Sequence, residues 1–326
     1  MKAARREAPQ LKCSQALVIA ENFGAGGNFC FERCPRETPL RRVLQLLERH
    51  DLLEIFVFTA QKELLARELG LRRWRCSVTP IFSEHCVSLG DVLREVHRMG
   101  IIHSDFLLIW GNVVSDLNLR YYVRLFEERA ERGRVIAMKF FVREEPRTPP
   151  EARQRNFVMF ERDSRVLRHF ERLSGEAYLL REHGQFAFLA AAEEHLQLHF
   201  DLEDAGLTLC SLDVFSVFSE HFEFSHEQDD FIRDVVTSEI PEEQVLAVIV
   251  PENVLHVRVN SSYKLLRATL LQLMHCGGAL ALEPGQFSVR LRDNHLLSHT
   301  AAVADRGGLG MNVLLEAGVR VEEGVR

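Results

Sequence analysis

The sequence predicts an α/β protein with helices on both faces of a doubly wound sheet, followed by the start of a parallel β-helix of hexapeptide repeats. Short apolar runs alternate with amphipathic segments through the first half, as βαβ units do. After residue 299, valines and leucines recur six residues apart, a period of neither a helix nor an ordinary strand. A chain of 326 residues, 46% of them hydrophobic, can form a sizeable core.

The first half supplies the strands and helices in the order that a parallel sheet requires. QALVIA and EIFVFTA are continuous apolar runs typical of buried strands, and PLRRVLQLLERH between them carries the apolar stripe of a helix. The Pro-rich segment 144–155 is interpreted as an excursion from the sheet and not as a domain boundary, because strand-like runs resume directly after it. The expected strands are 15–20, 54–60, 76–82, 105–110, 135–142 and 156–160, and the expected helices are 39–50, 89–99 and 117–133.

Composition excludes several classes of protein. The net charge of -7 and the absence of a Lys/Arg cluster argue against a nucleic-acid partner, and no apolar stretch approaches the length of a membrane span. The seven cysteines are scattered without a secretory signal, which favours a reducing compartment, the cytosol. Cys30 and Cys34 lack a second ligand pair and are interpreted as structural thiols, not as a zinc site. Residues 1–10 are expected to form a disordered tail.

The period-six pattern near the end of the chain forms two interleaved rows. Leu309, Leu315 and Val321 continue a row that begins at Val303, and a second row holds 313, 319 and 325. A solenoid repeat buries its apolar face only against its neighbours, and about three or more repeats are needed for stability. Either the native chain continues or a partner stacks on these rows.

The stretch FLLIWGNVVSDLNL, 106–119, predicts a buried strand, a turn and a helix. Ser115 or Asp116 is expected to cap that helix. In an α/β sheet, ligands and metals bind at the carboxyl end of such a strand, where the chain carries Asn112 instead of an aspartate.

Three motifs resemble the N-terminal region of the epsilon subunits of eukaryotic translation initiation factor 2B, a guanine-nucleotide exchange factor. They are SLGDVLREV (88–96), SDFLLIWGNVVSDLNL (104–119) and the stretch 199–236 that contains SEHFEFSHEQDDF. The gamma subunit of the same factor shares the architecture and remains an alternative. The resemblance implies a nucleotidyltransferase-like (Rossmann-like) domain at 14–260, a helical connector at 261–299 and a partial left-handed β-helix at 300–326.

The resemblance also implies a degenerate nucleotide site. Active pyrophosphorylases use a Gly-rich loop for the triphosphate and two carboxylates for Mg²⁺, because a hard cation prefers oxygen anions. Here the loop carries Gly24, Gly26 and Gly27, Asn112 replaces the first carboxylate, and Arg258 in HVRVNSSY falls near the second. We therefore expect no catalytic residue, no metal and no cofactor. A divergent sugar-nucleotide pyrophosphorylase stays the alternative.

The partners that the resemblance implies are the gamma and other subunits of initiation factor 2B, and GDP-bound initiation factor 2 as substrate. The family carries an Asn-Phe pair that is implicated in engaging the substrate factor, and His221 and Phe222 match it here. Ordinary packing of Phe222 and Phe224 at a helix end is the open alternative. Leu309, Leu315 and Val321 are the expected β-helix interface. Exchange itself resides in a C-terminal helical domain of the family that lies outside this sequence, so this chain alone is not expected to catalyse it.

Overall fold

The computed structural model describes most of the chain between residues 13 and 323. The predicted N-terminal tail lies outside the described residues, as do Gly24 and Gly26. The described ranges are 13–23, 27–34, 37–146, 148–150, 153–154, 156–173, 195–237, 243–274, 287–290, 295–304 and 309–323.

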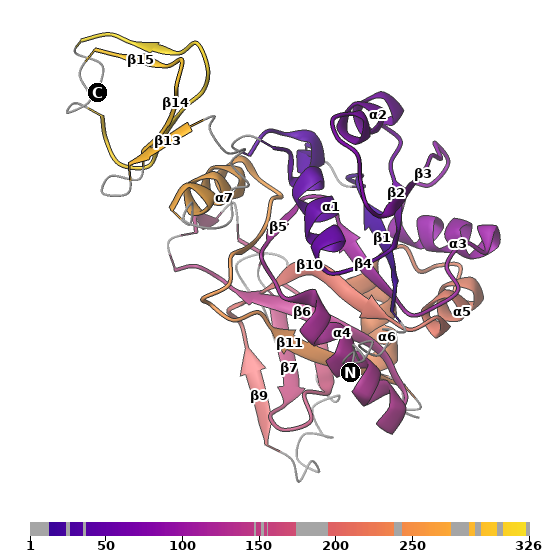
Figure 1. Ribbon diagram of the computed structural model, residues 1–326. Helices are drawn as coiled ribbons and strands as arrows, with labels where there is room; N and C mark the ends of the chain where they lie inside the picture. Colours follow the sequence, from indigo (N-terminus) through magenta and orange to yellow (C-terminus); the bar gives the residue numbers. More distant parts are fainter. Residues whose placement is uncertain are drawn as a thin grey trace, which may run out of the picture.

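A seven-stranded mixed sheet lies at the centre of the molecule, in the order β11-β6-β10-β4-β1-β2-β3 (Figure 1). β1 is parallel to both neighbours, so that Leu17 lies opposite Phe56 of β2 and Leu108 of β4. β10 runs antiparallel to β4 and β6, and β11 is parallel to β6. The strands are β1 (Gln15–Ile19), β2 (Glu54–Phe58), β3 (Ser77–Ile81), β4 (Phe106–Trp110), β6 (Val135–Arg143), β10 (Leu202–Cys210) and β11 (Gln244–Ile249).

Helices cover both faces of this sheet, which confirms the predicted α/β class. Successive side chains of a strand point to opposite faces, and in β1 Ala16 and Val18 join one core cluster while Leu17 and Ile19 join the other. The first face is covered by α1 (Pro39–Arg49), α2 (Lys62–Gly70) and α4 (Leu119–Arg132), and the second by α3 (Leu89–Met99), α5 (Asp213–Glu220), η4 (Glu227–Ile232) and α6 (Arg233–Thr237).

Local capping signals set the helix boundaries. Thr38 accepts a hydrogen bond from the Arg41 amide at 3.3 Å directly before Pro39, so α1 begins where its sequence predicts. Ser88 accepts a hydrogen bond from the Asp91 amide at 3.2 Å, and α3 ends at Gly100, whose φ of 61° is left-handed.

The predicted cap of α4 is wrong. Asn118, and neither Ser115 nor Asp116, caps the helix by accepting a hydrogen bond from the Tyr121 amide at 3.4 Å. The chain stays extended longer than expected because β5 (Val113–Ser115) pairs with β12 (His256–Arg258). The Asp116 carboxylate instead lies 3.5 Å from the guanidinium of Arg49.

The Pro-rich segment leads to a second, three-stranded antiparallel sheet. This sheet has the order β8-β7-β9, and an isolated bridge joins Val166 to Leu246 of β11. Val158 and Phe170 belong to the same core cluster as the α3 face of the main sheet. The excursion therefore rejoins the central core, but its strands form their own sheet. They are β7 (Asn156–Glu161), β8 (Leu167–Arg172) and β9 (Leu196–His199).

Short strands follow α7 (Ser262–Met274) and lie beyond it, away from the main sheet (Figure 1). β14 is parallel to β16, with His295 opposite Val313, and β15 is parallel to β17, with Ala302 opposite Arg320. Both pairs thus join residues eighteen positions apart in the chain. The strands are β13 (Phe287–Arg290), β14 (His295–Ser298), β15 (Ala302–Val303), β16 (Val313–Leu315) and β17 (Arg320–Val321).

The expected helical connector over 261–299 needs correction. Among its described residues α7 alone is helical, whereas β13 and β14 already form sheet structure before residue 300. β14 pairs with β16, so the pairing eighteen residues apart starts earlier than the rows of valine and leucine indicate.

Candidate functional site

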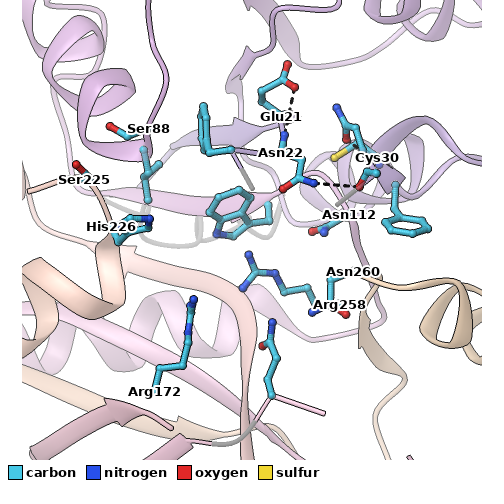
Figure 2. A pocket seen from close by; sticks show the side chains of 17 residues that line it. Glu21, Asn22, Cys30, Ser88, Asn112, Arg172, Ser225, His226, Arg258 and Asn260 are labelled. Atoms are coloured by element: carbon cyan, nitrogen blue, oxygen red, sulfur yellow. Dashed lines mark hydrogen bonds between the residues drawn. The ribbon is translucent and has the colours of Figure 1, made fainter. Parts of the chain in front are cut away.

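A cavity of about 350 Å³ opens at the carboxyl ends of β1 and β4 (Figure 2). This is the position at which open α/β sheets bind ligands. Asn112, Arg258 and Asn260 lie on one side of the cavity, and Ser225 and His226 lie on the other. The structure therefore brings the predicted site residues Asn112 and Arg258 together in one cavity, although they are far apart in sequence.

The glycine loop contributes Gly27 to the cavity wall. A Cβ at Gly27 would meet its nearest neighbour, a ring carbon of Phe29, at 3.9 Å, so this position does not require glycine for a close approach. The Asn22 side-chain amide donates to the Gly27 carbonyl at 3.2 Å, and the Asn28 amide donates to the Ala20 carbonyl at 3.1 Å. The described part of the loop is thus held by side-chain amides. Cys30 lies directly after it, in η1 (Phe29–Phe31).

Asn112 performs a task that an aspartate is unable to perform. Its side-chain Nδ2 donates to the carbonyl of Val259 at 2.9 Å, and the Val259 amide donates to the Asn112 carbonyl at 2.8 Å. An ionised carboxylate has no proton to donate, so an aspartate here would face a carbonyl oxygen. The amide therefore ties the end of β4 to the segment that carries Arg258.

Arg258 enters the cavity wall from β12. Its guanidinium carbon lies 4.6 Å from the centre of the Trp110 ring, and its Nη1 forms an ion pair with Asp204 of β10. Asp204 also lies 2.8 Å from Nζ of Lys139, whose side chain is fully buried. Arg258 is thus a cation held in place by a carboxylate behind it.

These two ion pairs keep Asp204 ionised despite its burial. Burial alone would raise the pKa of Asp204, but Lys139 and Arg258 hold it well below its usual range. Close by, His256 contacts the Ser115 hydroxyl at 2.9 Å and the Ala205 carbonyl at 2.8 Å, and burial lowers its pKa to about 4. At neutral pH, His256 is therefore uncharged and Asp204 is ionised.

Gly206 provides the space in which the Arg258 side chain lies. It sits within an irregularity of the β10–β6 pairing and has a φ of +78°. A Cβ at this position would lie 2.9 Å from Cδ of Arg258 and 2.9 Å from a methyl of Val113. Only glycine combines this backbone conformation with so close an approach.

The acidic residue on the cavity wall, Glu21, already accepts hydrogen bonds from protein groups. Glu21 accepts hydrogen bonds from the Thr59 hydroxyl at 3.2 Å and from the Ala60 amide at 2.9 Å. Among the described residues, no three His, Cys, Asp or Glu side chains are grouped so that they could hold a metal ion. Burial raises the pKa of the Cys30 and Cys34 thiols, which keeps both in the protonated form at neutral pH.

The remaining predicted residues lie outside the cavity. Phe222 is 76% exposed and Phe224 is buried in the core, so the packing alternative holds for Phe224 and is wrong for Phe222. His221 stacks on Phe224 with ring centroids 4.6 Å apart. In the segment after α7, Leu309, Leu315 and Val321 are half-buried.

Sequence reasoning missed the residues behind the site. Asp204 and Lys139 carry no motif, and the only local signal was a pair of acids inside an otherwise apolar stretch, LEDAGLTLC. Trp110 is a strand residue, as predicted, but no sequence pattern indicates that its ring contacts Arg258. None of the helices in the described part of the chain combines the length and hydropathy that a membrane span requires.

The architecture is similar in fold to nucleotidyltransferases of known structure. It matches a Bacillus anthracis protein assigned as a glucose-1-phosphate thymidylyltransferase, with a TM-score of 0.57 and 13% identity over 79% of this chain and 94% of that chain. It also matches the inositol-1-phosphate CTP transferase from T. maritima, with a TM-score of 0.50 and 12% identity over 79% of this chain and 96% of that chain. The chain therefore has a nucleotidyltransferase-like α/β fold.

Sequence comparison identifies more specific relatives than the fold does. No family model matches the chain. It is 27% identical over 259 residues to translation initiation factor eIF2B subunit epsilon of Schizosaccharomyces pombe, covering 73% of this chain and 37% of that protein. It is 24% identical over 249 residues to the epsilon subunit of Dictyostelium discoideum, covering 72% and 35%. The predicted resemblance is confirmed: most of this chain is similar to the eIF2B epsilon subunit, and it spans a little over a third of the length of these relatives.

Proposed function

We propose that this chain acts in the cytosol as a subunit of the guanine-nucleotide exchange factor for translation initiation factor 2. Its nucleotidyltransferase-like domain, 14–260, serves assembly and binding and does not transfer nucleotides. The observation that carries this proposal is the similarity to two eIF2B epsilon subunits over almost three quarters of the chain. Both relatives are epsilon subunits, which favours epsilon over gamma.

The cavity supports the absence of nucleotidyl transfer. A divalent cation that bridges phosphates needs carboxylate or other oxygen ligands. Asn112 uses its side-chain NH₂ to bind Val259, and Arg258 brings a positive charge to the second position. Coulomb repulsion between a guanidinium and Mg²⁺ opposes metal binding there. Gly24, Gly26 and Gly27 would then be a loop without a phosphate to bind.

The segment 300–326 supports assembly as a partial left-handed β-helix. The spacing of eighteen residues between paired strands equals three hexapeptides, one complete turn of such a helix. Leu309, Leu315 and Val321 are only half-buried in the isolated chain. Stacking of a gamma-like subunit on these rows would bury them further, as neighbouring turns do in a solenoid.

Phe222 supports contact with GDP-bound initiation factor 2. An aromatic side chain that is 76% exposed leaves apolar area in water, and such side chains are enriched at protein interfaces. His221 stands where the family has an asparagine, and its ring is occupied by stacking on Phe224. The contact is therefore assigned to Phe222 and not to the pair.

Affinity purification of the tagged chain from its own cells tests this proposal. Near-stoichiometric recovery of a gamma-like subunit and initiation factor 2, identified by mass spectrometry, is the expected result. Phe222→Ala should reduce recovery of initiation factor 2 and leave the gamma-like subunit bound. Tyr121→Ala, which removes an aromatic side chain of 58% exposure from α4, is the matched control and should change neither. A homo-oligomer without these partners would contradict the proposal.

A divergent sugar-nucleotide pyrophosphorylase is the competing function, supported by the nucleotidyltransferase-like fold and the open cavity. Incubation with a nucleoside triphosphate, a sugar 1-phosphate and Mg²⁺ separates the two. Release of pyrophosphate above background would favour the enzyme. The ion pair between Arg258 and Asp204 leads us to expect none.

A further inference from the structure

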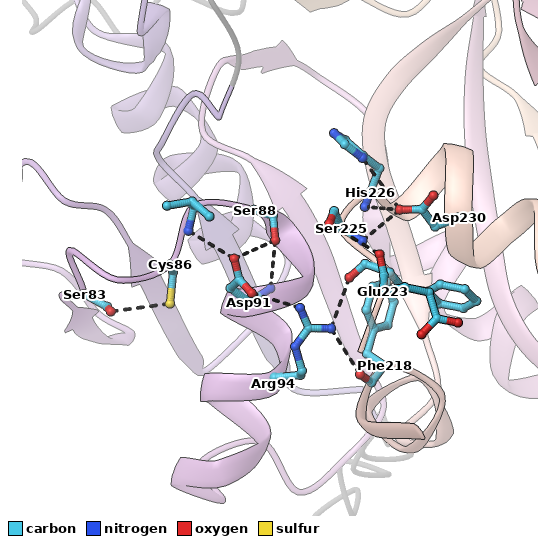
Figure 3. A network of polar contacts seen from close by, with 12 residues as sticks. Ser83, Cys86, Ser88, Asp91, Arg94, Phe218, Glu223, Ser225, His226 and Asp230 are labelled. Atoms are coloured by element: carbon cyan, nitrogen blue, oxygen red, sulfur yellow. Dashed lines mark hydrogen bonds and ion pairs between the residues drawn. The ribbon is translucent and has the colours of Figure 1, made fainter. Parts of the chain in front are cut away.

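The turn that carries Phe222 connects the end of α5 to η4 and is held at several points (Figure 3). Phe218 and Phe224 on either side of it are buried, with ring centroids 6.0 Å apart, whereas Phe222 between them is exposed. The turn itself contains one backbone hydrogen bond, from the Phe224 amide to the His221 carbonyl at 3.2 Å. Its conformation therefore depends on contacts from other elements.

The first contact comes from the backbone at the start of α3. The Gly90 amide donates to the carbonyl of Ser225 at 3.1 Å. A Cβ on Gly90 would collide with the carbonyl oxygen of Phe224, so the helix and the turn touch backbone to backbone. This close approach accounts for glycine in the first turn of a helix, where it is otherwise unfavourable.

The second contact is the Arg94 side chain, one turn further along α3. Its Nη1 donates to the carbonyl of Phe224 at 3.1 Å and to the carbonyl of Phe218 at 3.3 Å, on the two sides of Phe222. Its Nη2 donates to Asp91 at 2.9 Å, which fixes the direction of the guanidinium (Figure 3). Hydrogen bonds from charged donors are stronger than those between neutral groups.

Asp91 is itself held by the α3 cap. It accepts hydrogen bonds from the Ser88 hydroxyl at 2.8 Å and from the Val87 amide at 3.1 Å. Burial opposes its ionisation, but the hydrogen bonds from Arg94, Ser88 and Val87 lower its pKa below the usual value. The carboxylate is therefore charged at neutral pH and pairs with Arg94.

The third contact closes the far end of the turn. The carboxylate of Asp230 accepts hydrogen bonds from the amides of Ser225 and His226, both at 2.8 Å. Ser225 and His226 also line the cavity. One end of the turn therefore forms part of the cavity wall, and the exposed Phe222 lies at the other end.

We propose that Arg94 is a positioning residue that joins the two sides of this turn and so presents Phe222 to the partner on a rigid backbone. The proposal rests on the proposed function, in which Phe222 contacts GDP-bound initiation factor 2. A preordered turn loses less conformational entropy on binding than a mobile one. Arg94 itself needs no contact with the partner.

The test combines binding with hydrogen exchange in the 326-residue chain. Arg94→Met keeps the aliphatic stem and removes the donors. We expect it to weaken binding to purified GDP-loaded initiation factor 2 on the order of tenfold. It should also speed exchange of the Phe224 amide by a similar factor, because the turn opens more often. Arg94→Lys keeps the charge but loses the two-pronged geometry, and should restore binding only in part.

Arg98→Met is the matched control, since Arg98 lies one turn further along α3 and pairs only with Glu95 among the described residues. It should change neither binding nor exchange. The double variant Arg94→Met/Phe222→Ala should bind no more weakly than Phe222→Ala alone, because Arg94 acts through Phe222.

Two outcomes would overturn the proposal. The first is an unchanged exchange rate of the Phe224 amide in Arg94→Met. The second is that Arg94→Met weakens binding by the same factor in the Phe222→Ala background as in the chain that keeps Phe222. Failure of the proposed function is recognised separately, since Phe222→Ala alone would then leave binding intact. Hydrogen exchange would still decide in that case whether Arg94 orders the turn.

Discussion

Replacing Asp204 with asparagine tests whether the charges behind the cavity hold this region together. Asp204 and Lys139 are buried and lie 2.8 Å apart, and Arg258 pairs with the same carboxylate. Coulomb's law with an effective dielectric constant of about 20 gives roughly 6 kcal/mol for the lysine pair alone. The cost of dehydrating the charges offsets part of this gain, and removing one partner of a buried pair costs roughly 3–5 kcal/mol.

We therefore expect Asp204→Asn to lower the free energy of unfolding by about 4 kcal/mol, a large share of the roughly 5–15 kcal/mol of an ordinary domain. Urea denaturation measures this change. With a slope of roughly 3 kcal/mol per molar, the midpoint should fall by roughly 1–2 M. Asp201→Asn is the control, since its ion pair with Arg143 is about half exposed and should contribute less than about 1 kcal/mol. Equal midpoints for the two variants would refute the reasoning.

The pH dependence gives a second check of the same ion pairs. Lys139 and Arg258 make the pKa of Asp204 lower in the folded chain than in the unfolded chain, despite its burial. A carboxylate of this kind stabilises the fold above the unfolded pKa of about 4, and this stability is lost as the pH falls further. Asp204→Asn should remove that part of the acid dependence.

Three further predictions concern other parts of the chain. Asn112→Asp should produce no Mg²⁺-dependent pyrophosphate release, because Arg258 still opposes the metal; robust turnover would show that Arg258 does not occupy the second metal position. His256 has a pKa of about 4 when folded and about 6.5 when unfolded, so stability should fall by up to about 3 kcal/mol between pH 6.5 and 4. His256→Gln should flatten that part of a urea-midpoint profile, and an unchanged slope would contradict the burial argument. Leu315→Asp should abolish soluble expression or co-purification of a gamma-like subunit, because it places an unpaired carboxylate in a stacked apolar row; normal assembly would contradict the hexapeptide register.

The features that the sequence predicted well are those set by neighbouring residues. The helix 89–99 was predicted with the bounds that α3 has, because its cap at Ser88 and its stop at Gly100 are local signals. Position 112 was correctly assigned to the carboxyl end of a buried strand, since a glycine and an asparagine directly follow an apolar run.

The features that the sequence did not predict depend on distant partners. β10 was not predicted as a strand because Glu203 and Asp204 interrupt its apolar pattern. Those charges are tolerated only because Lys264 and Lys139 pair with them from other segments. Phe222 and Phe224 were not separable by pattern, because the burial of Phe224 depends on partners distant in sequence: its carbonyl contacts Gly90 and Arg94 of α3, and its side chain belongs to the core cluster on the α3 face.

The spacing of the strand pairs after α7 restricts how this part of the chain can change length. A single residue inserted within β14 or β16 would turn the following side chains of that strand to the opposite face, because alternation along a strand has a period of two. In the proposed β-helix, an insertion of eighteen residues would add one complete turn and return every later side chain to the same face. Insertions and deletions within the strands of the proposed β-helix should therefore be tolerated in whole turns, and the proposed stacking surface would then move along the helix axis with its shape unchanged.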